Sequence, residues 1–163
     1  MSYTGVTVKI PTEITETKIG QNAFNSYTKL TSITVPATVT EIGWAAFSGC
    51  TNLTAITIPD SVTTIERGTF GSCSSLTKVI IPNGVTVIKD DLFNSCSNLA
   101  EITLPAGITA IEGYVFRNCS NLANIYFRGT EEQWNAITKG DNWNKDMGSN
   151  VEGGTVITYN YTG

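Results

Sequence analysis

A phenylalanine recurs every 23 residues along this chain. The five copies are Phe24, Phe47, Phe70, Phe93 and Phe116, and five leucines keep the same spacing: Leu30, Leu53, Leu76, Leu99 and Leu122. A unit of this length cannot bury a hydrophobic face alone, so successive copies must stack and share one continuous core. The repeat therefore predicts a solenoid.

Each repeat contains an extended segment that ends at a proline. Ahead of Pro59, Ile56 and Ile58 point to one side of the segment, and Ala55 and Thr57 point to the other. Proline has no N–H to donate to a sheet, so the strand should end there. The prolines that share this position are Pro36, Pro59, Pro82 and Pro105. We therefore expect one strand in each repeat, followed by a turn away from the sheet.

The rest of each repeat returns the chain to the next strand. Residues 65–70 favour a short helical or 3₁₀ turn that carries Phe70 into the core. Small polar residues follow, as expected where backbone groups need local hydrogen bonds. The first copy has two additional residues between Ile14 and Ile19, which predict a bulge near the N-terminal end.

Both ends of the repeat array differ from its middle within what we expect to be a single domain, 1–163. Residues 1–10 predict an N-terminal edge strand, residues 11–127 hold the five repeats, and residues 128–163 predict a C-terminal cap. Thr130 and Gln133 have the spacing of a capping box, so a helix is expected over about 130–138, and a closing strand over about 156–161. Such a cap would cover the core and the unpaired strand edge.

The repeated unit reads I-P-x-x-V-T-x-I-x-x-x-x-F-x-x-C-x-x-L-x-x-I-x. It resembles the BspA-like bacterial leucine-rich repeat over about residues 8–127, and residues 126–135 resemble the segment that often closes such arrays. The resemblance implies an α/β solenoid, a right-handed superhelix with a concave parallel β-sheet and short helical or 3₁₀ turns on the convex side. It also implies a protein of the bacterial cell surface, or a secreted one, that adheres to host or matrix proteins.

Charge and hydropathy limit the partners of the chain. Its formal net charge of −4 and its pI of about 4.7 argue against a nucleic acid or an anionic membrane as partner, because both attract basic surfaces. No stretch approaches 18 apolar residues, so no membrane insertion is expected. Residues 1–5 lack the charged and apolar regions of a signal peptide.

The four cysteines occupy one repeat position, and so predict a ladder. They are Cys50, Cys73, Cys96 and Cys119. Stacked strands would place successive Cα atoms about 5 Å apart, within the range of a disulfide, but the side chains of a stacked ladder run parallel. Zinc needs four ligands that converge on one point, which a line of thiols does not provide. We therefore expect free, buried thiols that pack as small hydrophobic groups.

The chain offers little to a catalytic mechanism. It contains no histidine, the commonest general base, and no nucleophile elbow or phosphate-binding glycine loop. The acidic pairs Asp90-Asp91 and Glu131-Glu132 are expected to be solvated, and residues 140–146 lack the alternating acidic spacing of a calcium loop. We therefore expect a protein that is not an enzyme, without cofactor or metal.

A binding surface is the sharper hypothesis, and strand alternation predicts its position. If Ile56 and Ile58 face the core, the opposite row of the sheet faces outward. Its candidate partner-binding residues are Thr34, Thr57, Lys78, Ile80, Glu101, Thr103, Asn124 and Tyr126. Trp44 is a further candidate, because the same position elsewhere holds Gln21, Arg67 and Asp90. The alternatives are that threonine simply suits exposed strands, and that Trp44 packs across a neighbouring turn or the N-terminal edge.

The leading functional hypothesis is recognition or adhesion through this concave strip, with a protein or a glycan as the partner. The alternative is a structural role, as a spacer, as the terminal fragment of a longer repeat array, or as an attachment component of a phage-like particle. The sequence leaves the oligomeric state open.

Overall fold

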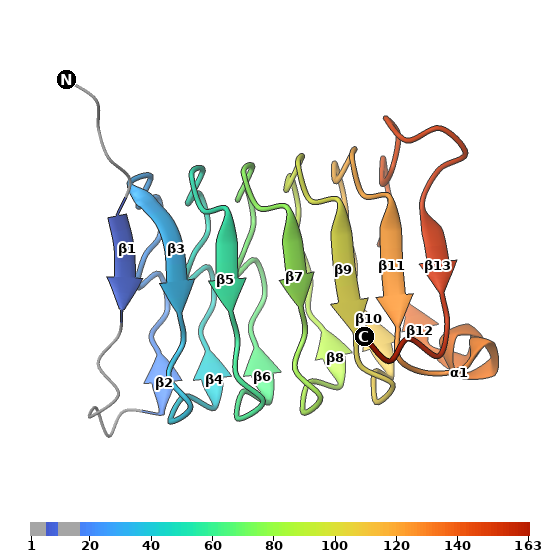
Figure 1. Ribbon diagram of the computed structural model, residues 1–163, viewed down its shortest axis with the longest axis horizontal. Helices are drawn as coiled ribbons and strands as arrows, with labels where there is room; N and C mark the ends of the chain where they lie inside the picture. Colours follow the sequence, from blue (N-terminus) through green and yellow to red (C-terminus); the bar gives the residue numbers. More distant parts are fainter. Residues whose placement is uncertain (1–5, 10–16) are drawn as a thin grey trace.

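The computed structural model describes residues 6–9 and 17–163, and it shows a β-solenoid built from parallel strands (Figure 1). Each repeat contributes one longer strand to one side of the molecule. These strands are β1 (Val6–Lys9), β3 (Leu30–Thr34), β5 (Ala55–Thr57), β7 (Lys78–Ile80), β9 (Glu101–Leu104), β11 (Asn124–Phe127) and β13 (Val156–Thr158). We call the outward surface of these strands the long-strand face.

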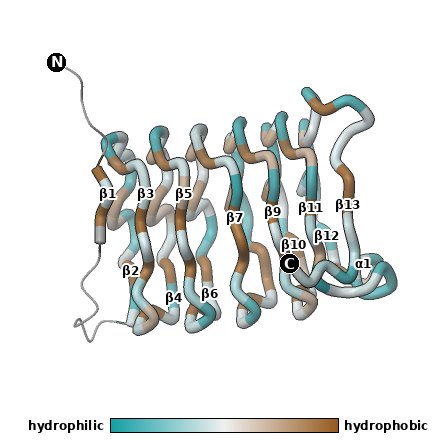
Figure 2. Tube along the Cα trace, viewed as in Figure 1, coloured by the Kyte–Doolittle hydropathy of each residue, from teal (hydrophilic) through white to brown (hydrophobic). Residues whose placement is uncertain are grey.

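Short strands form a second side, which the sequence did not predict. They are β2 (Lys18–Ile19), β4 (Glu41–Ile42), β6 (Thr64–Ile65), β8 (Val87–Ile88), β10 (Ala110–Ile111) and β12 (Thr138–Lys139). Within the repeats the register is 23 residues, so Ile33 pairs with Ile56 and Ile42 pairs with Ile65. Identical apolar residues therefore stack on identical neighbours, and hydrophobic positions recur at matching heights along the solenoid (Figure 2).

The third side of each turn carries phenylalanine into the core, and we call it the phenylalanine corner (residues 43–50 and their equivalents in the other repeats). The helical or 3₁₀ turns expected here are absent from the described repeats, which have hydrogen-bonded turns instead. Two residues of each turn adopt positive φ, a conformation that interrupts a helix. They are Asn22, Ala45, Gly68, Asp91 and Tyr114 at one position, and Ser26, Gly49, Ser72, Ser95 and Asn118 at the other.

The core is organised as side-chain ladders. The rings of Phe24, Phe47, Phe70, Phe93 and Phe116 stack nearly parallel, with successive centroids 5.3, 5.7, 5.5 and 5.9 Å apart. The four cysteines are free and buried, as the sequence predicted. Each thiol also donates a hydrogen bond to the carbonyl of a phenylalanine 26 residues earlier, as in Cys96 Sγ to Phe70 O at 3.0 Å. Cysteine thus satisfies a buried backbone acceptor as well as filling space.

The C-terminal cap continues the solenoid for one irregular turn. Helix α1 (Glu131–Ala136) follows the end of β11, and its capping box forms between Thr130 and Gln133. The next strand, β12, pairs with β10, and β13 then pairs with β11. Trp134 and Trp143 close the end of the core with edge-on contacts to Phe127 and Phe116. The predicted closing strand is present but limited to β13, and β12 was not predicted.

At the other end, β1 pairs with β3 in parallel. The bulge predicted between Ile14 and Ile19 falls mainly on residues 10–16, which lie outside the described residues, as do residues 1–5 of the predicted edge.

Both sheets are interrupted at the same repeat boundary. The long strands divide into β1-β3-β5 and β7-β9-β11-β13, and the short strands divide into β2-β4-β6 and β8-β10-β12. Figure 1 shows β5 and β7 set apart from one another. The phenylalanine corner remains continuous there, since the amide of Phe70 donates to Leu92 O at 3.0 Å and that of Ser72 to Asn94 O at 2.7 Å. The two halves of the solenoid are therefore joined along one corner and through the core.

Candidate recognition surface

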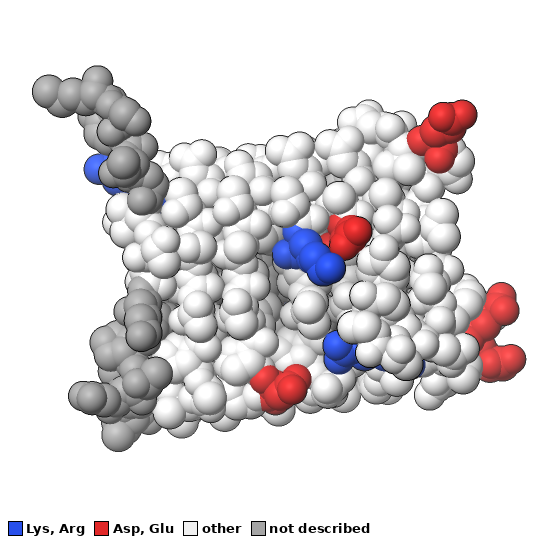
Figure 3. Space-filling view, viewed as in Figure 1, with Lys and Arg blue, Asp and Glu red and all other residues white. Residues whose placement is uncertain are grey.

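The long-strand face displays the predicted row of outward side chains, and few of them are charged (Figure 3). Thr34, Thr57 and Lys78 are exposed, and Ile80 is 48% exposed, which is high for an aliphatic side chain. The remaining members of the row are less accessible: Glu101, Asn124 and Tyr126 are half-buried. The accessible part of the row therefore lies on β3, β5 and β7.

Thr103 corrects the sequence prediction, because it is only 1% exposed. It belongs to the outward row, with Ile80 and Tyr126 as its partners in the neighbouring strands. The C-terminal tail crosses this end of the molecule in front of the sheet (Figure 1). Tyr161 of the tail stacks on Tyr126 with ring centroids 4.5 Å apart, and its amide donates to Phe127 O. Large neighbours and the tail thus remove Thr103 from the surface.

Lys78 and Glu101 neutralise each other on this face. Lys78 Nζ lies 3.2 Å from Glu101 Oε2, and the two side chains are 50% and 35% exposed. The hydrogen bond that Lys78 donates to the Glu101 carboxylate, and then the negative charge of that carboxylate, raise the pKa of Lys78. The lysine therefore stays protonated at neutral pH, and the pair leaves the middle of the face without net charge.

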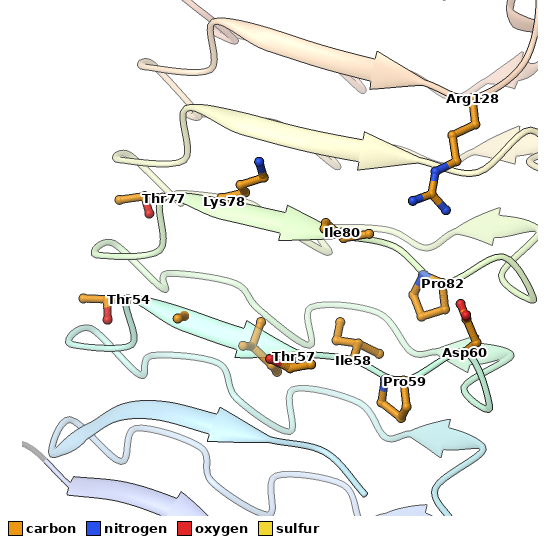
Figure 4. Close-up of a pocket in the computed structure, with 12 residues that line it drawn as sticks. Thr54, Thr57, Ile58, Pro59, Asp60, Thr77, Lys78, Ile80, Pro82 and Arg128 are labelled. Carbon is orange, nitrogen blue, oxygen red and sulfur yellow. The ribbon is translucent and has the colours of Figure 1, made fainter. Parts of the chain in front are cut away.

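A groove opens where the sheet divides between β5 and β7 (Figure 4). Its volume is about 520 Å³. Ile56 and Ile58, predicted to lie in the core, are only half-buried because β7 does not pair with β5. Together with Ile80 they give the groove aliphatic lining. The groove therefore presents hydrophobic surface that a continuous sheet would cover.

One end of the groove carries polar and charged groups. Arg128 occupies the repeat position that holds proline in the preceding copies, and its side chain reaches back past one repeat, so that Nη1 donates to Asn83 Oδ1 at 3.0 Å. Asp60 lies at the same end (Figure 4). Among the described residues, neither Arg128 nor Asp60 forms an ion pair. This end can therefore offer both a guanidinium and a carboxylate to a partner.

The structure brings together only part of the predicted site. Thr57, Lys78 and Ile80 line the groove, and Thr34 lies on the neighbouring strand β3. Glu101, Asn124 and Tyr126 lie on the same face but outside the groove lining, and Trp44 belongs to a separate hollow that shares no residue with the groove. Four residues that line the groove were not predicted as site residues: Ile56, Ile58, Asp60 and Arg128. The departure from proline at Arg128 was the one available signal.

The cysteine ladder provides no reactive thiolate. Burial raises the pKa of Cys50 to about 11 and that of Cys119 to about 12, and it raises the pKa values of Cys73 and Cys96 as well. Since the thiolate is the nucleophile and the metal ligand, these cysteines are inert at neutral pH.

Across residues 6–9 and 17–163 no group of three His, Cys, Asp or Glu side chains could hold a metal ion. Nor does any helix there have the length and apolar character needed to cross a membrane.

Comparison with known families agrees with this architecture. Residues 17–137 match the BspA type leucine-rich repeat region, in six copies. The chain belongs to the BspA-type leucine-rich repeat family. The family match has one copy more than the five repeats predicted from the phenylalanine spacing. Repeats of this family generally act as non-catalytic scaffolds.

Solved structures of bacterial leucine-rich repeat proteins are similar to this BspA-type chain. A leucine-rich cell surface protein from Faecalibacterium prausnitzii A2-165 is 37% identical over 81% of the chain and 34% of that protein, with a TM-score of 0.76. The leucine-rich repeat protein of T. pallidum is 29% identical over 85% of the chain and 70% of that protein, with a TM-score of 0.72. One from Eubacterium ventriosum is 27% identical over 78% and 32%, with a TM-score of 0.64.

The chain thus spans about a third of the length of the F. prausnitzii protein. A comparison with curated proteins gave no match.

Proposed function

We propose that this BspA-type domain is a non-catalytic recognition module that binds a protein partner at a bacterial cell surface through its long-strand face. The groove between β5 and β7 is the centre of the contact. The observation that carries the proposal is the exposed aliphatic surface of Ile56, Ile58 and Ile80 on a face with few charges.

Energetics favour an interface at this place. Burial of apolar surface stabilises a complex by roughly 25 cal/mol per Å², so half-buried isoleucines can contribute to a contact without any change of fold. Protein interfaces typically combine such an apolar centre with a polar rim. Here Thr54, Thr57 and Thr77 supply hydroxyl groups along the groove, and Asp60 and Arg128 supply charges at one end.

The cellular setting of the proposal rests on similarity. The F. prausnitzii relative is described as a cell surface protein, and its structure resembles this chain over most of the chain's length. A surface module with an accessible, preformed groove can adhere to host or matrix proteins without ordering a flexible segment, which lowers the entropic cost of binding.

A binding assay with groove variants tests the proposal. The probes are immobilised purified matrix proteins such as collagen and fibronectin, together with a labelled extract of epithelial surface proteins. We expect saturable binding that Thr57→Glu and Ile80→Glu each reduce at least tenfold, because a carboxylate in the apolar centre must be desolvated. Thr38→Glu is the matched control, since Thr38 is exposed but does not line the groove.

The proposal fails if both groove variants bind as well as the unmodified chain. Unchanged melting temperatures of the variants would show that a loss of binding does not come from unfolding. Absence of binding to every probe would instead favour the structural alternative, a spacer within a longer array.

A further inference from the structure

Trp44 presents an aromatic surface that the fold does not use. Trp44 is 43% exposed, and within residues 6–9 and 17–163 it makes no ring contact with another aromatic residue and no hydrogen bond through Nε1. The indole lies over the next repeat at Gly68, where Nε1 is 3.9 Å from the position that a Cβ would take. The indole thus lies across the neighbouring turn, as one alternative had it, and much of the residue nevertheless remains open to solvent.

Small residues beside the indole create a hollow of about 300 Å³ on the phenylalanine corner. In this turn the second repeat carries Ala45 and Ser48, and the third repeat carries Gly68 and Gly71 at the equivalent two positions. The flanking repeats carry longer polar residues there, Asn22 with Asn25 and Asp91 with Asn94. Two repeats with small side chains thus form the floor, and the repeats on either side form the rims.

The two rims are built alike. Asn25 Nδ2 donates to Asn22 Oδ1 at 3.3 Å on one side, and Asn94 Nδ2 donates to Asp91 Oδ1 at 2.9 Å on the other. These bonds orient the side chains. The Nδ2 donors of Asn22 and further acceptor capacity on Asp91 remain available to a ligand. Two repeats lie between the rims, so the rims are three repeat steps apart, about 14 Å at the usual strand spacing.

Two hydroxyl groups add to the polar lining of the hollow. The hydroxyls of Ser48 and Ser72 both line it, and neither makes a hydrogen bond to any residue that the structure describes. Arg67 and Asp91, whose closest N–O distance is 4.0 Å, bring opposite charges, so the site has no net charge. The hollow therefore offers one aromatic side chain surrounded by hydrogen-bond donors and acceptors whose charges balance.

We propose that this hollow binds a pyranose unit of a glycan. One face of a pyranose presents C–H groups, which suit the electron-rich face of an indole, and its rim carries hydroxyls that both donate and accept hydrogen bonds. Trp44 is the stacking platform, and Asn22, Ser48, Asp91 and Asn94 contact the hydroxyls. The volume is near the lower end for ligand pockets and suits one or two sugar units.

The same chemistry argues against other ligand classes. An anionic ligand would need an excess of positive charge, and Asp91 balances Arg67. An apolar peptide would leave the amides and hydroxyls of the hollow unpaired, which is costly once water is excluded. This site is separate from the groove of the proposed function, with which it shares no residue.

The test uses the whole chain with a glycan array and with methyl glycosides of glucose, galactose, mannose, N-acetylglucosamine and fucose, measured by ligand-observed NMR. We expect binding of at least one sugar class. Its affinity should fall at least tenfold in Trp44→Gln and in Gly71→Asn. The first variant restores the residue of the preceding repeat at Gln21, and the second fills the hollow with the residue found at Asn25 and Asn94. Trp44→Tyr should retain most of the affinity, because it keeps an aromatic platform.

Two controls make the outcome decisive. Ile80→Glu should leave sugar binding unchanged, so a failure of this proposal is distinguishable from a failure of the proposed function. Melting temperatures of the Trp44 and Gly71 variants show whether a loss reflects unfolding. The proposal is overturned if no sugar binds at millimolar concentration, or if Trp44→Gln and Gly71→Asn bind sugar as well as the unmodified chain does. It is also overturned if Trp44→Gln abolishes binding of a protein but leaves sugar binding unchanged.

Discussion

The phenylalanine corner and the two strand sides of this solenoid respond differently to the same repeat boundary. Between the third and fourth repeats the corner keeps its backbone hydrogen bonds, its ring stacking at 5.5 Å and its thiol–carbonyl bond. Both sheets lose their pairing at that boundary. The corner repeats phenylalanine and cysteine with little variation, whereas β5 and β7 juxtapose unlike residues such as Ala55 and Lys78. The phenylalanine corner therefore holds the two halves together, and the unpaired strands leave room for a groove.

The opening of the long-strand sheet determines which hydrophobic side chains are accessible to a partner. A corner that holds the two halves together allows the sheet to open without loss of the core, so hydrophobic side chains become accessible at Ile56 and Ile58. In the rest of the long-strand face, pairing covers the equivalent residues, such as Val79 and Ile81. A functional surface is thus created by an interruption of the repeat.

The largest expected effect is on the ladder that crosses the boundary. Phe70→Ala should lower the free energy of unfolding by about 3–5 kcal/mol, because a fully buried ring stacked on two others is removed. Phe24→Ala is the matched comparison and should cost clearly less, since Phe24 is only half-buried at the end of the stack. Urea denaturation measures both. A loss below about 1 kcal/mol for Phe70→Ala would contradict the role given to the corner.

A smaller effect is expected in amide exchange at the interrupted sheets. The amides of Val35 and Ala100 donate to Thr57 O and Thr77 O, but the equivalent amides of Ile58 and Thr77 have no such bond across the boundary. Ile58 and Thr77 should therefore exchange at least about tenfold faster than Val35 and Ala100, a difference of about 1.4 kcal/mol in local opening. Hydrogen exchange followed by NMR tests this directly. Equal protection at all four amides would mean that the sheets are continuous in solution.

The last effect is zero at neutral pH, where it is the smallest of the three, and it emerges only in alkali. Burial raises the pKa of Cys50 from 9.0 to about 11, so the unfolded chain releases this proton before the folded chain does. Stability that is present below pH 9 is therefore lost as the pH rises from about 9 to about 11. Urea unfolding of the unmodified chain and of Cys50→Ala across this window isolates the thiol, because the other titrating groups are shared. The difference in free energy of unfolding between the unmodified chain and Cys50→Ala should become smaller as the pH rises. A difference that stays constant with pH would contradict the raised pKa of Cys50.

Much of the fold could be predicted because the repeat specifies local and neighbouring interactions at once. Leu53, Phe70 and Cys73 fall at fixed positions of the 23-residue unit, and all three are buried. The Phe70 ring stacks on the equivalent rings of both neighbouring copies. The capping box at Thr130 and Gln133 is equally local, since its partners are three residues apart. Features of this kind depend on a few adjacent residues, which a single sequence displays.

The candidate site could be predicted only in part. Alternation placed Thr57, Lys78 and Ile80 on the outward side of their strands, which is where they lie. Alternation says nothing about what covers a side chain, and Thr103 is buried beside a tail that lies about 60 residues further along the chain. The division of the sheet was not visible either, because it depends on how well β5 and β7 fit one another across the boundary.

The sequence by itself determined that this chain stacks as a leucine-rich repeat solenoid, which residues form its phenylalanine and cysteine ladders, and which side of each strand faces out. Those properties follow from periodicity, because every copy must bury the same positions against its neighbours. Only the tertiary structure decided where the sheets divide, that Ile56 and Ile58 are accessible, and that Thr103 is not. These depend on the fit between particular neighbouring copies and on the path of the distant tail, and periodicity specifies neither.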